Sequence, residues 1–154
     1  METRYARTLT LPMGEVIIES DGNAITALRF GKVEASNTCP ILADCARQLT
    51  EYCAGKRTTF DLPLAPRGTE FQQTIWRLLT KIPYGQTRTY GELAAILGNP
   101  KAARAVGMAC NKNPILLLIP CHRVVGSNGS LIGYAGGLDA KAWLLELERN
   151  KRHG

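Results

Sequence analysis

Residues 115–124 read Ile-Leu-Leu-Leu-Ile-Pro-Cys-His-Arg-Val, a continuous apolar run followed by a proline and three reactive or basic side chains. The apolar run predicts a segment buried in the core of the fold. Pro120 ends regular pairing because it lacks an N–H and fixes its φ angle. The cysteine that follows has two basic neighbours, and nearby positive charge favours the nucleophilic thiolate. We therefore predict that Cys121 is a reactive residue rather than a packing residue.

The part of the chain before this run begins with β-rich sequence. Residues 4–11, 16–18 and 24–30 are rich in strand-forming side chains and are separated by turn signals, which predicts a hairpin or meander. An amphipathic pattern over residues 39–54 predicts a helix that ends at a glycine. Residues 58–62 have the composition of a short strand.

A segment with two prolines and a glycine, residues 62–68, has the character of a linker. The chain has 154 residues, enough for one compact core or two small ones. We therefore place a first domain at residues 1–65 and a second at 66–154. The second domain is expected to begin with a helix capped by Thr69 and to end with a helix over 138–149.

Two short helices are predicted in the middle of the second domain, over residues 92–97 and 101–111, joined by a glycine-containing turn. This is a helix-turn-helix pattern. The second helix is unusually slim because it carries Ala102, Ala103 and further small residues. Small side chains allow close helix packing, and they also suit entry into a widened DNA minor groove. The residues alone leave both interpretations open.

The composition favours an anionic partner and disfavours a membrane. The formal net charge is +6 and the pI is near 9.2, which suits nucleic acid. No apolar run approaches the roughly 20 residues that cross a bilayer, and the sequence begins without the apolar core of a signal peptide. We expect a cytoplasmic protein.

Five cysteines, an odd number, argue against a disulfide framework in such a protein. A zinc site is also not expected, because the chain has no C-x-x-C pair and only two histidines, His122 and His153. We predict no metal and no cofactor.

His122 is the natural base for the Cys121 thiol, directly or through a water. A carboxylate that accepts the other ring N–H would orient it. Glu146 and Glu148 both lie on the final predicted helix, and spacing alone does not choose between them.

Taken together, these motifs resemble the O6-alkylguanine-DNA alkyltransferases, a family of direct-reversal repair proteins. The resemblance spans roughly residues 71–148, about half of the chain. It rests on these runs: Asn113-Pro114, Ile119-Pro120-Cys121-His122-Arg123-Val124, Gly133-Tyr134-Ala135-Gly136-Gly137, Lys141, Trp143-Leu144-Leu145, Glu148, and residues 98–107 for the helix-turn-helix. It implies an α/β (α+β) fold, with a small N-terminal ribonuclease-H-like β-sheet domain before a mostly helical domain.

The resemblance also implies the reaction. Cys121 would take the alkyl group from guanine O6, and His122 would activate it through a water while Glu148, rather than Glu146, holds the histidine. Asn113 would bridge the helix-turn-helix and the active-site segment. Tyr90 would assist base flipping and supply a proton toward the departing guanine. The product is a thioether that no residue in the sequence could cleave, so each protein would repair one lesion.

Duplex DNA carrying O6-alkylguanine, and also O4-alkylthymine, is the partner that the resemblance implies, with no obligate protein partner. Arg104 would fill the gap left by the flipped base. The remaining residues that it assigns to DNA binding are Ala102, Ala103, Gly107 and Arg123. Those that it assigns to the substrate pocket are Tyr90, Val124, Tyr134, Ala135 and Gly136.

Some members have a polar residue where this chain has Ala135, so a hydrogen bond to the base would be missing or come from the backbone. The small residues at 133–137 predict a roomy pocket that accepts larger alkyl groups. Three other function classes are disfavoured. Binding-only relatives typically carry tryptophan in place of Cys121, and regulatory members add a cysteine-rich metal domain. A hydrolase would need an oxyanion motif and a histidine distant in the sequence, whereas the only other histidine, His153, lies in the tail.

Overall fold

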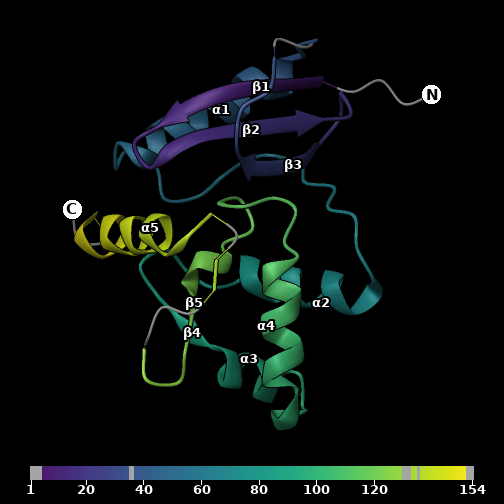
Figure 1. Cartoon of the computed structure of the whole chain (residues 1–154), viewed down its shortest axis with the longest axis vertical. Helices are drawn as coiled ribbons and strands as arrows, with labels where there is room; N and C mark the ends of the chain where they lie inside the picture. Colours follow the sequence, from purple (N-terminus) through teal and green to yellow (C-terminus); the bar gives the residue numbers. More distant parts are fainter. Residues whose placement is uncertain (1–4, 35–36, 130–132, 135, 152–154) are drawn as a thin grey trace. The chain divides into compact units, whose positions relative to one another are not determined.

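The computed structural model describes residues 5–34, 37–129, 133, 134 and 136–151. The chain divides into two compact units (Figure 1). One unit comprises residues 1–67 together with 114–118, and the other comprises 68–113 and 119–154. The division expected from the sequence placed residues 114–118 in the second domain. The structure groups them with the first unit, because their backbone pairs with its sheet.

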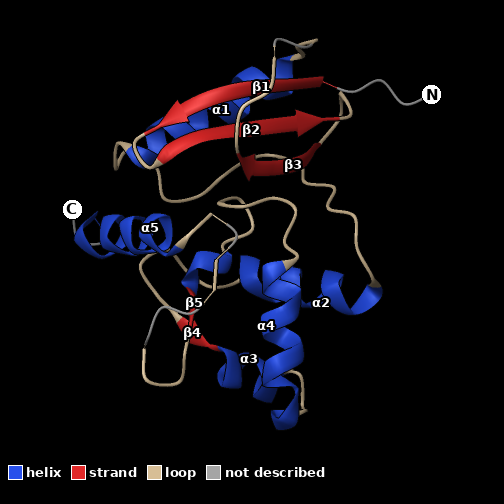
Figure 2. Ribbon diagram, viewed as in Figure 1, coloured by secondary structure: helices blue, strands red, loops and turns tan. Residues whose placement is uncertain are grey.

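That sheet has three antiparallel strands in the order β1-β2-β3, where β1 is Tyr5–Leu11, β2 is Gly14–Ser20 and β3 is Ile25–Phe30. The register pairs Thr8 with Ile17 and Ile18 with Leu28. Helix α1, Pro40–Cys53, packs on β1 and β2 (Figure 2). The meander and the helix form as the sequence predicts.

The outer edge of β3 pairs with two passing segments instead of a fourth strand. Ile25 forms a parallel bridge with Leu64, and Leu28 forms one with Ile115. The strand expected over residues 58–62 is wrong, because pairing begins only at residue 63, where the Pro63 carbonyl accepts from the Ile25 N–H. Residues 115–119 are buried, as expected, but residues 116–118 form a turn, and Leu117 has the left-handed φ of 70° that leucine rarely adopts.

The second unit is mostly helical. Its helices are α2 (Glu70–Thr80), α3 (Tyr90–Ile96), the 3₁₀ turn η1 (Pro100–Ala102), α4 (Ala103–Asn111), the 3₁₀ turn η2 (Cys121–Arg123) and α5 (Leu138–Lys151). Thr69 caps α2, as the sequence predicts, and its side chain and that of Gln72 form a reciprocal capping box. Thr89 and Glu92 form the same motif at α3, which therefore starts two residues earlier than expected.

A short parallel pairing fixes the centre of this unit. Strand β4, Arg88–Thr89, pairs with β5, Val124–Val125. Because β4 leads directly into α3 and β5 directly follows η2, this pairing brings the start of α3 beside the turn that carries Cys121. A three-stranded sheet with helix α1 in the first unit and a mostly helical second unit confirm the α/β fold class.

Helices α3 and α4 contact each other and form the helix-turn-helix, while α4 also contacts α2. The Trp76 indole N–H of α2 donates to the Ala109 carbonyl of α4 at 2.9 Å. This buried hydrogen bond fixes the end of α4 that leads to the reactive segment.

Candidate active site

The Cys121 side chain lies at the first position of η2, just after Pro120, and is almost fully buried. The Asn113 side-chain amide donates to its Sγ atom at 3.2 Å and to the Ile119 carbonyl at 2.8 Å. Asn113 follows the end of α4, so one buried amide ties the helix-turn-helix to the reactive turn. A donor on sulfur stabilises negative charge there.

The electrostatics of the thiol differ from the sequence-based expectation. Burial raises the pKa of Cys121 to about 11, although the Asn113 hydrogen bond and the positive charge of Lys141 act to lower it. The neighbouring Arg123 does not supply the expected stabilisation, because its charge is engaged elsewhere. The resting side chain is therefore a neutral thiol, and a base must remove its proton before it can act as a nucleophile.

His122 and Glu148 form the base and its orienting group. His122 Nε2 and Glu148 Oε2 are 2.8 Å apart, and both side chains are shielded from solvent. Burial lowers the pKa of His122, against the opposing effect of Glu148. His122 is thus a neutral imidazole at neutral pH, the form that can accept a proton.

The structure separates the two glutamates that the sequence left open. Glu148 is buried on α5 against His122, whereas Glu146 is exposed and bonds to Arg149 and Asn150. The buried positions of α5 are 140, 141, 144 and 148, and two of them are charged residues. Burial of a charged side chain is costly unless it is paired, which itself marks Glu148 as a functional residue.

The Arg123 side chain is buried beside His122 and Glu148 and does not lie at the protein surface. Its Nε donates to Glu148 Oε1 at 2.8 Å, one terminal nitrogen donates to Oε2 at 2.9 Å, and the other donates to the Ile82 carbonyl at 2.7 Å. Sequence reasoning assigned Arg123 to DNA, but its buried guanidinium is directed into the protein. No local sequence pattern identifies this role, because Arg123 and Glu148 lie 25 positions apart on two different elements.

Glu148 consequently receives hydrogen bonds from three directions. The Gly85 N–H also donates to Oε1, at 3.2 Å. Burial acts to raise the pKa of Glu148, but the hydrogen bonds and charges of His122 and Arg123 outweigh it and lower the pKa to about 2. The carboxylate therefore stays ionised throughout the physiological range.

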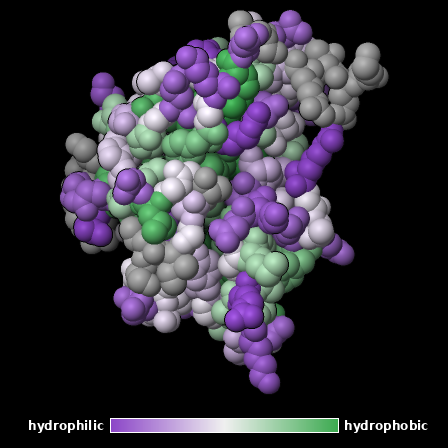
Figure 3. Space-filling view, in the orientation of Figure 1, coloured by the Kyte–Doolittle hydropathy of each residue, from purple (hydrophilic) through white to green (hydrophobic). Residues whose placement is uncertain are grey.

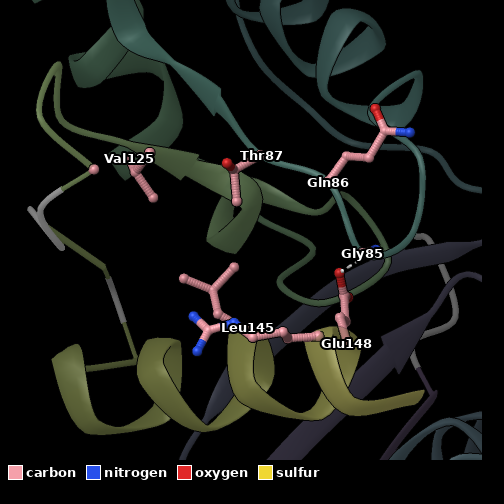
Figure 4. A pocket seen from close by; sticks show the side chains of 8 residues that line it. Gly85, Gln86, Thr87, Val125, Leu145 and Glu148 are labelled. Carbon is pink, nitrogen blue, oxygen red and sulfur yellow. Dashed lines mark hydrogen bonds between the residues drawn. The ribbon is translucent and has the colours of Figure 1, made fainter. Parts of the chain in front are cut away.

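A cavity of about 290 Å³ adjoins this network (Figure 4). Its lining residues are Gly85, Gln86, Thr87, Val125, Gly129, Leu145, Glu148 and Arg149. In Figure 4 the dashed line joins Gly85 to the Glu148 carboxylate. Glu148 is the one residue that the cavity shares with the predicted site, so the cavity lies beside the carboxylate and not over the thiol.

Tyr90 and Cys110 lie close enough to Cys121 for their charges to interact. Burial, together with the smaller effects of the neighbouring Cys110 and Cys121, raises the pKa of Tyr90 to about 12. A Cβ atom added to Gly107 would lie 3.7 Å from the Tyr90 ring. Gly107 therefore presents its free side to Tyr90 across the helix pair.

The remaining predicted pocket residues are only partly described. Val124 is fully buried in β5, and Tyr134 and Gly136 are half-buried. Ala135 lies outside the described residues, so the expectations attached to it stay predictions. The Lys141 ammonium of α5 is buried and donates to the Gly133 carbonyl at 3.2 Å, which ties this segment to α5.

The predicted DNA-binding residues lie along η1 and α4. Arg104 is exposed in the first turn of α4, and Ala102 and Ala103 are half-buried beside it. Met108 is 62% exposed on the same helix. In the region that carries α3 and α4, strongly hydrophilic side chains border residues of intermediate hydropathy (Figure 3).

Among the described residues, no three histidine, cysteine or acidic side chains come together as a metal site. All five cysteines are free thiols. No helix within the described part of the chain is long and apolar enough to cross a bilayer.

Comparison with known proteins gives consistent matches over nearly the whole chain. Residues 4–66 match the 6-O-methylguanine DNA methyltransferase ribonuclease-like domain, and residues 70–150 match the DNA-binding domain of the same family. A methylated-DNA–protein-cysteine methyltransferase of Methanosarcina acetivorans is 48% identical over 152 residues, covering 94% of this chain and 97% of the relative. A constitutive enzyme of that name from Bacillus subtilis is 45% identical, covering 94% and 95%.

Solved structures agree. The Mycobacterium tuberculosis O6-methylguanine methyltransferase superposes with a TM-score of 0.88 at 42% identity, covering 97% of this chain and 94% of that one. The same organism's protein in complex with DNA gives a TM-score of 0.89 at 43% identity, covering 96% and 94%. With two family models that together span residues 4–150 and relatives of this similarity, the chain belongs to the 6-O-methylguanine DNA methyltransferase family.

Proposed function

We propose that this protein repairs DNA by moving an alkyl group from guanine O6 onto Cys121. The observation that carries the proposal is a buried thiol, hydrogen-bonded by Asn113, in the turn that also holds His122 against Glu148. Relatives at 45–48% identity are methylated-DNA–protein-cysteine methyltransferases. The transfer forms a carbon–sulfur bond and breaks the carbon–oxygen bond to the base.

The geometry supports a proton path for this step. His122 Nε2 is engaged by Glu148, so the thiol proton passes to Nδ1, directly or through a water. The imidazolium that forms lies against an ionised carboxylate, which stabilises it. The Asn113 amide remains on sulfur and stabilises the thiolate until it attacks the alkyl carbon.

Tyr90 is the proposed proton donor toward the departing base. Its raised pKa keeps the phenol protonated, so that it can donate a hydrogen bond where negative charge develops on guanine. The alkyl carbon is hidden in the base stack, so we propose that the nucleotide is flipped out first. The exposed Arg104 would then occupy the vacated space. O4-alkylthymine presents the same reacting group and is proposed as a second substrate.

We infer that the protein acts in the cytoplasm, on duplex DNA, without an obligate protein partner, metal or cofactor. Free thiols support a reducing compartment. The product is a thioether, which does not hydrolyse under ordinary conditions, so we propose that each molecule acts once.

The direct test is to mix equal amounts of protein and an O6-methylguanine oligonucleotide and to measure the intact protein mass. One added methyl group is expected, and peptide mapping should place it on Cys121. Cys121→Ala should abolish transfer and still bind the damaged duplex. Cys110→Ala is the matched control and should still be methylated. An adduct on Cys110, or an unchanged mass, would contradict the proposal.

The role of Arg104 is tested by comparing two substrates. Arg104→Ala should slow repair of duplex DNA more than reaction with the free alkylated base, because only the duplex needs the flipped state to be stabilised. Arg77, an exposed arginine on α2, provides the control Arg77→Ala with the same change in charge. Equal losses of rate on both substrates would contradict the proposal that Arg104 fills the space left by the flipped base.

A further inference from the structure

Arg123 makes contacts that neither DNA binding nor thiol chemistry requires. Three of its nitrogens donate to Glu148 and to the Ile82 carbonyl, at 2.7–2.9 Å. Its side chain is 8% exposed, and that of Glu148 is 1% exposed. A paired fork of this kind fixes both oxygens of the carboxylate in one plane.

The same carboxylate also serves His122, so two basic groups share one negative charge. Oε2 accepts from Arg123 and lies 2.8 Å from His122 Nε2. A carboxylate with no other partner would favour an imidazolium at its side, because burial leaves its charge unscreened. The Arg123 charge offsets that attraction, and it acts to lower the pKa of His122.

We propose that Arg123 is a positioning residue that holds Glu148 in place and neutralises its charge, so that His122 rests as a neutral base able to take the thiol proton. This inference rests on the proposed function of His122. The guanidinium donates to Glu148 and to the Ile82 carbonyl. It acts through the carboxylate, and the loss of its charge should leave His122 already protonated when substrate arrives.

Other charged or titratable groups face this network from the elements around it. Among the described residues they are Lys141 of α5, Cys121 of η2, Tyr84 of the loop after α2, and Tyr134 of the segment before α5. Lys141 acts on His122 in the same direction as Arg123, and it is unchanged in the variants below. Any shift seen on replacing Arg123 is therefore additional to the effect of Lys141.

The chain contains only two histidines, which makes a direct measurement possible. In a His153→Gln background, the one remaining imidazole can be titrated by NMR without any substrate. Arg123→Gln should move the His122 midpoint to higher pH. Arg77→Gln, which removes an exposed arginine of the same unit, should leave the midpoint unchanged. An unchanged midpoint in folded Arg123→Gln protein would overturn the proposal.

The rate of transfer from O6-benzylguanine, used as the free base, gives the second readout. The acid limb of the pH–rate profile should move to higher pH in Arg123→Gln, in step with the NMR midpoint. A merely structural role would lower the folded fraction without moving the acid limb.

If thermal melting shows that Arg123→Gln does not fold, the Arg123→Lys variant tests the proposal instead. It should keep the wild-type midpoint and lose rate at every pH, because the three N–H groups of one ammonium diverge from a single atom and do not reproduce the planar fork that binds both oxygens and the Ile82 carbonyl. Full rate in Arg123→Lys, or a midpoint moved upward in it, would overturn the proposal. Because the titration needs no transfer, a protein that fails to react at all would contradict the proposed function and not this inference.

Discussion

At the scale of single residues, the side-chain amide of Asn113 links helix geometry to thiol chemistry. Its nitrogen bonds both the Ile119 carbonyl and the Cys121 sulfur, at the two ends of the sharp turn around Pro120. A hydrogen bond to an ionised acceptor is about twice as strong as one between neutral groups. The amide therefore stabilises the thiolate more than the resting thiol.

We predict that Asn113→Ala raises the pKa of Cys121 and slows alkyl transfer. It also leaves the buried Ile119 carbonyl without this donor, at a cost of about 1–3 kcal/mol in the free energy of unfolding. The pH dependence of the transfer rate measures the first effect, and urea unfolding measures the second. Asn150→Ala removes an exposed amide on α5 and should change stability by no more than about 0.5 kcal/mol. A wild-type pH profile in Asn113→Ala would exclude the thiolate role.

At the scale of elements, the helix pair α3–α4 depends on a close approach between Gly107 and Tyr90. An added Cβ would lie 3.7 Å from the ring, which is ordinary van der Waals contact. There is thus room for a methyl group and no more. The position of the Tyr90 phenol is set by the small residue opposite it.

Gly107→Ala and Gly107→Leu should therefore have opposite effects. Alanine fits and favours the helix, so it should raise the free energy of unfolding by up to about 1 kcal/mol with little change in rate. Leucine should displace the Tyr90 ring and slow transfer, with DNA binding affected less. Urea unfolding and single-turnover rates separate the two effects. If leucine leaves the rate unchanged, the packing of Tyr90 on α4 does not position the phenol.

Elements whose apolar residues repeat regularly over several turns could be predicted from the sequence, whereas two-residue elements could not. The helices at α1, α2 and α5 follow from their apolar spacing, and Thr69 follows from its capping pattern. Strands β4 and β5 have two residues each, too few for any periodicity. They form because the segments around them pack, and that is a property of the folded chain.

The same limit applies to the candidate site. Cys121 and His122 stand out as neighbours, but the partner of Arg123 lies 25 positions away on another element. The local sequence does not distinguish Glu146 from Glu148 as the partner of His122. Glu148 is buried only because of how α5 packs in three dimensions. The resemblance to a known family named Glu148 as the partner of His122, and these two side chains lie 2.8 Å apart. It assigned Arg123 to DNA binding, whereas the Arg123 side chain is bonded to Glu148.

At the scale of the whole molecule, buried charge makes stability depend on pH. Burial lowers the pKa of His122, so the unfolded chain binds a proton there at a higher pH than the folded protein does. Stability from this group is present at neutral pH and is lost as pH falls below the pKa of an ordinary histidine. Glu148 has a folded pKa of about 2, so its contribution is present above its unfolded pKa and is lost only on further acidification.

The free energy of unfolding should therefore decline between pH 7 and pH 5, before most carboxylates titrate. One proton limits the slope to about 1.4 kcal/mol per pH unit. Urea unfolding at a series of pH values measures it. His122→Asn should flatten the curve in this range, although it lowers stability overall by leaving Glu148 with one partner fewer. A decline that persists unchanged in the variant would assign the effect to other groups.

The segment 114–118 has a consequence for how the polypeptide can be cut. It pairs with the edge of β3 in the sheet unit, although the chain on both sides of it belongs to the helical unit. Neither unit is therefore encoded by one uninterrupted stretch. A fragment starting at residue 68 would carry five residues whose natural neighbour, the edge of β3, has been deleted. A fragment ending at residue 67 would keep the Ile25–Leu64 bridge but leave the edge at Leu28 unpaired. Separately expressed halves should each aggregate, and co-expression should restore a soluble pair.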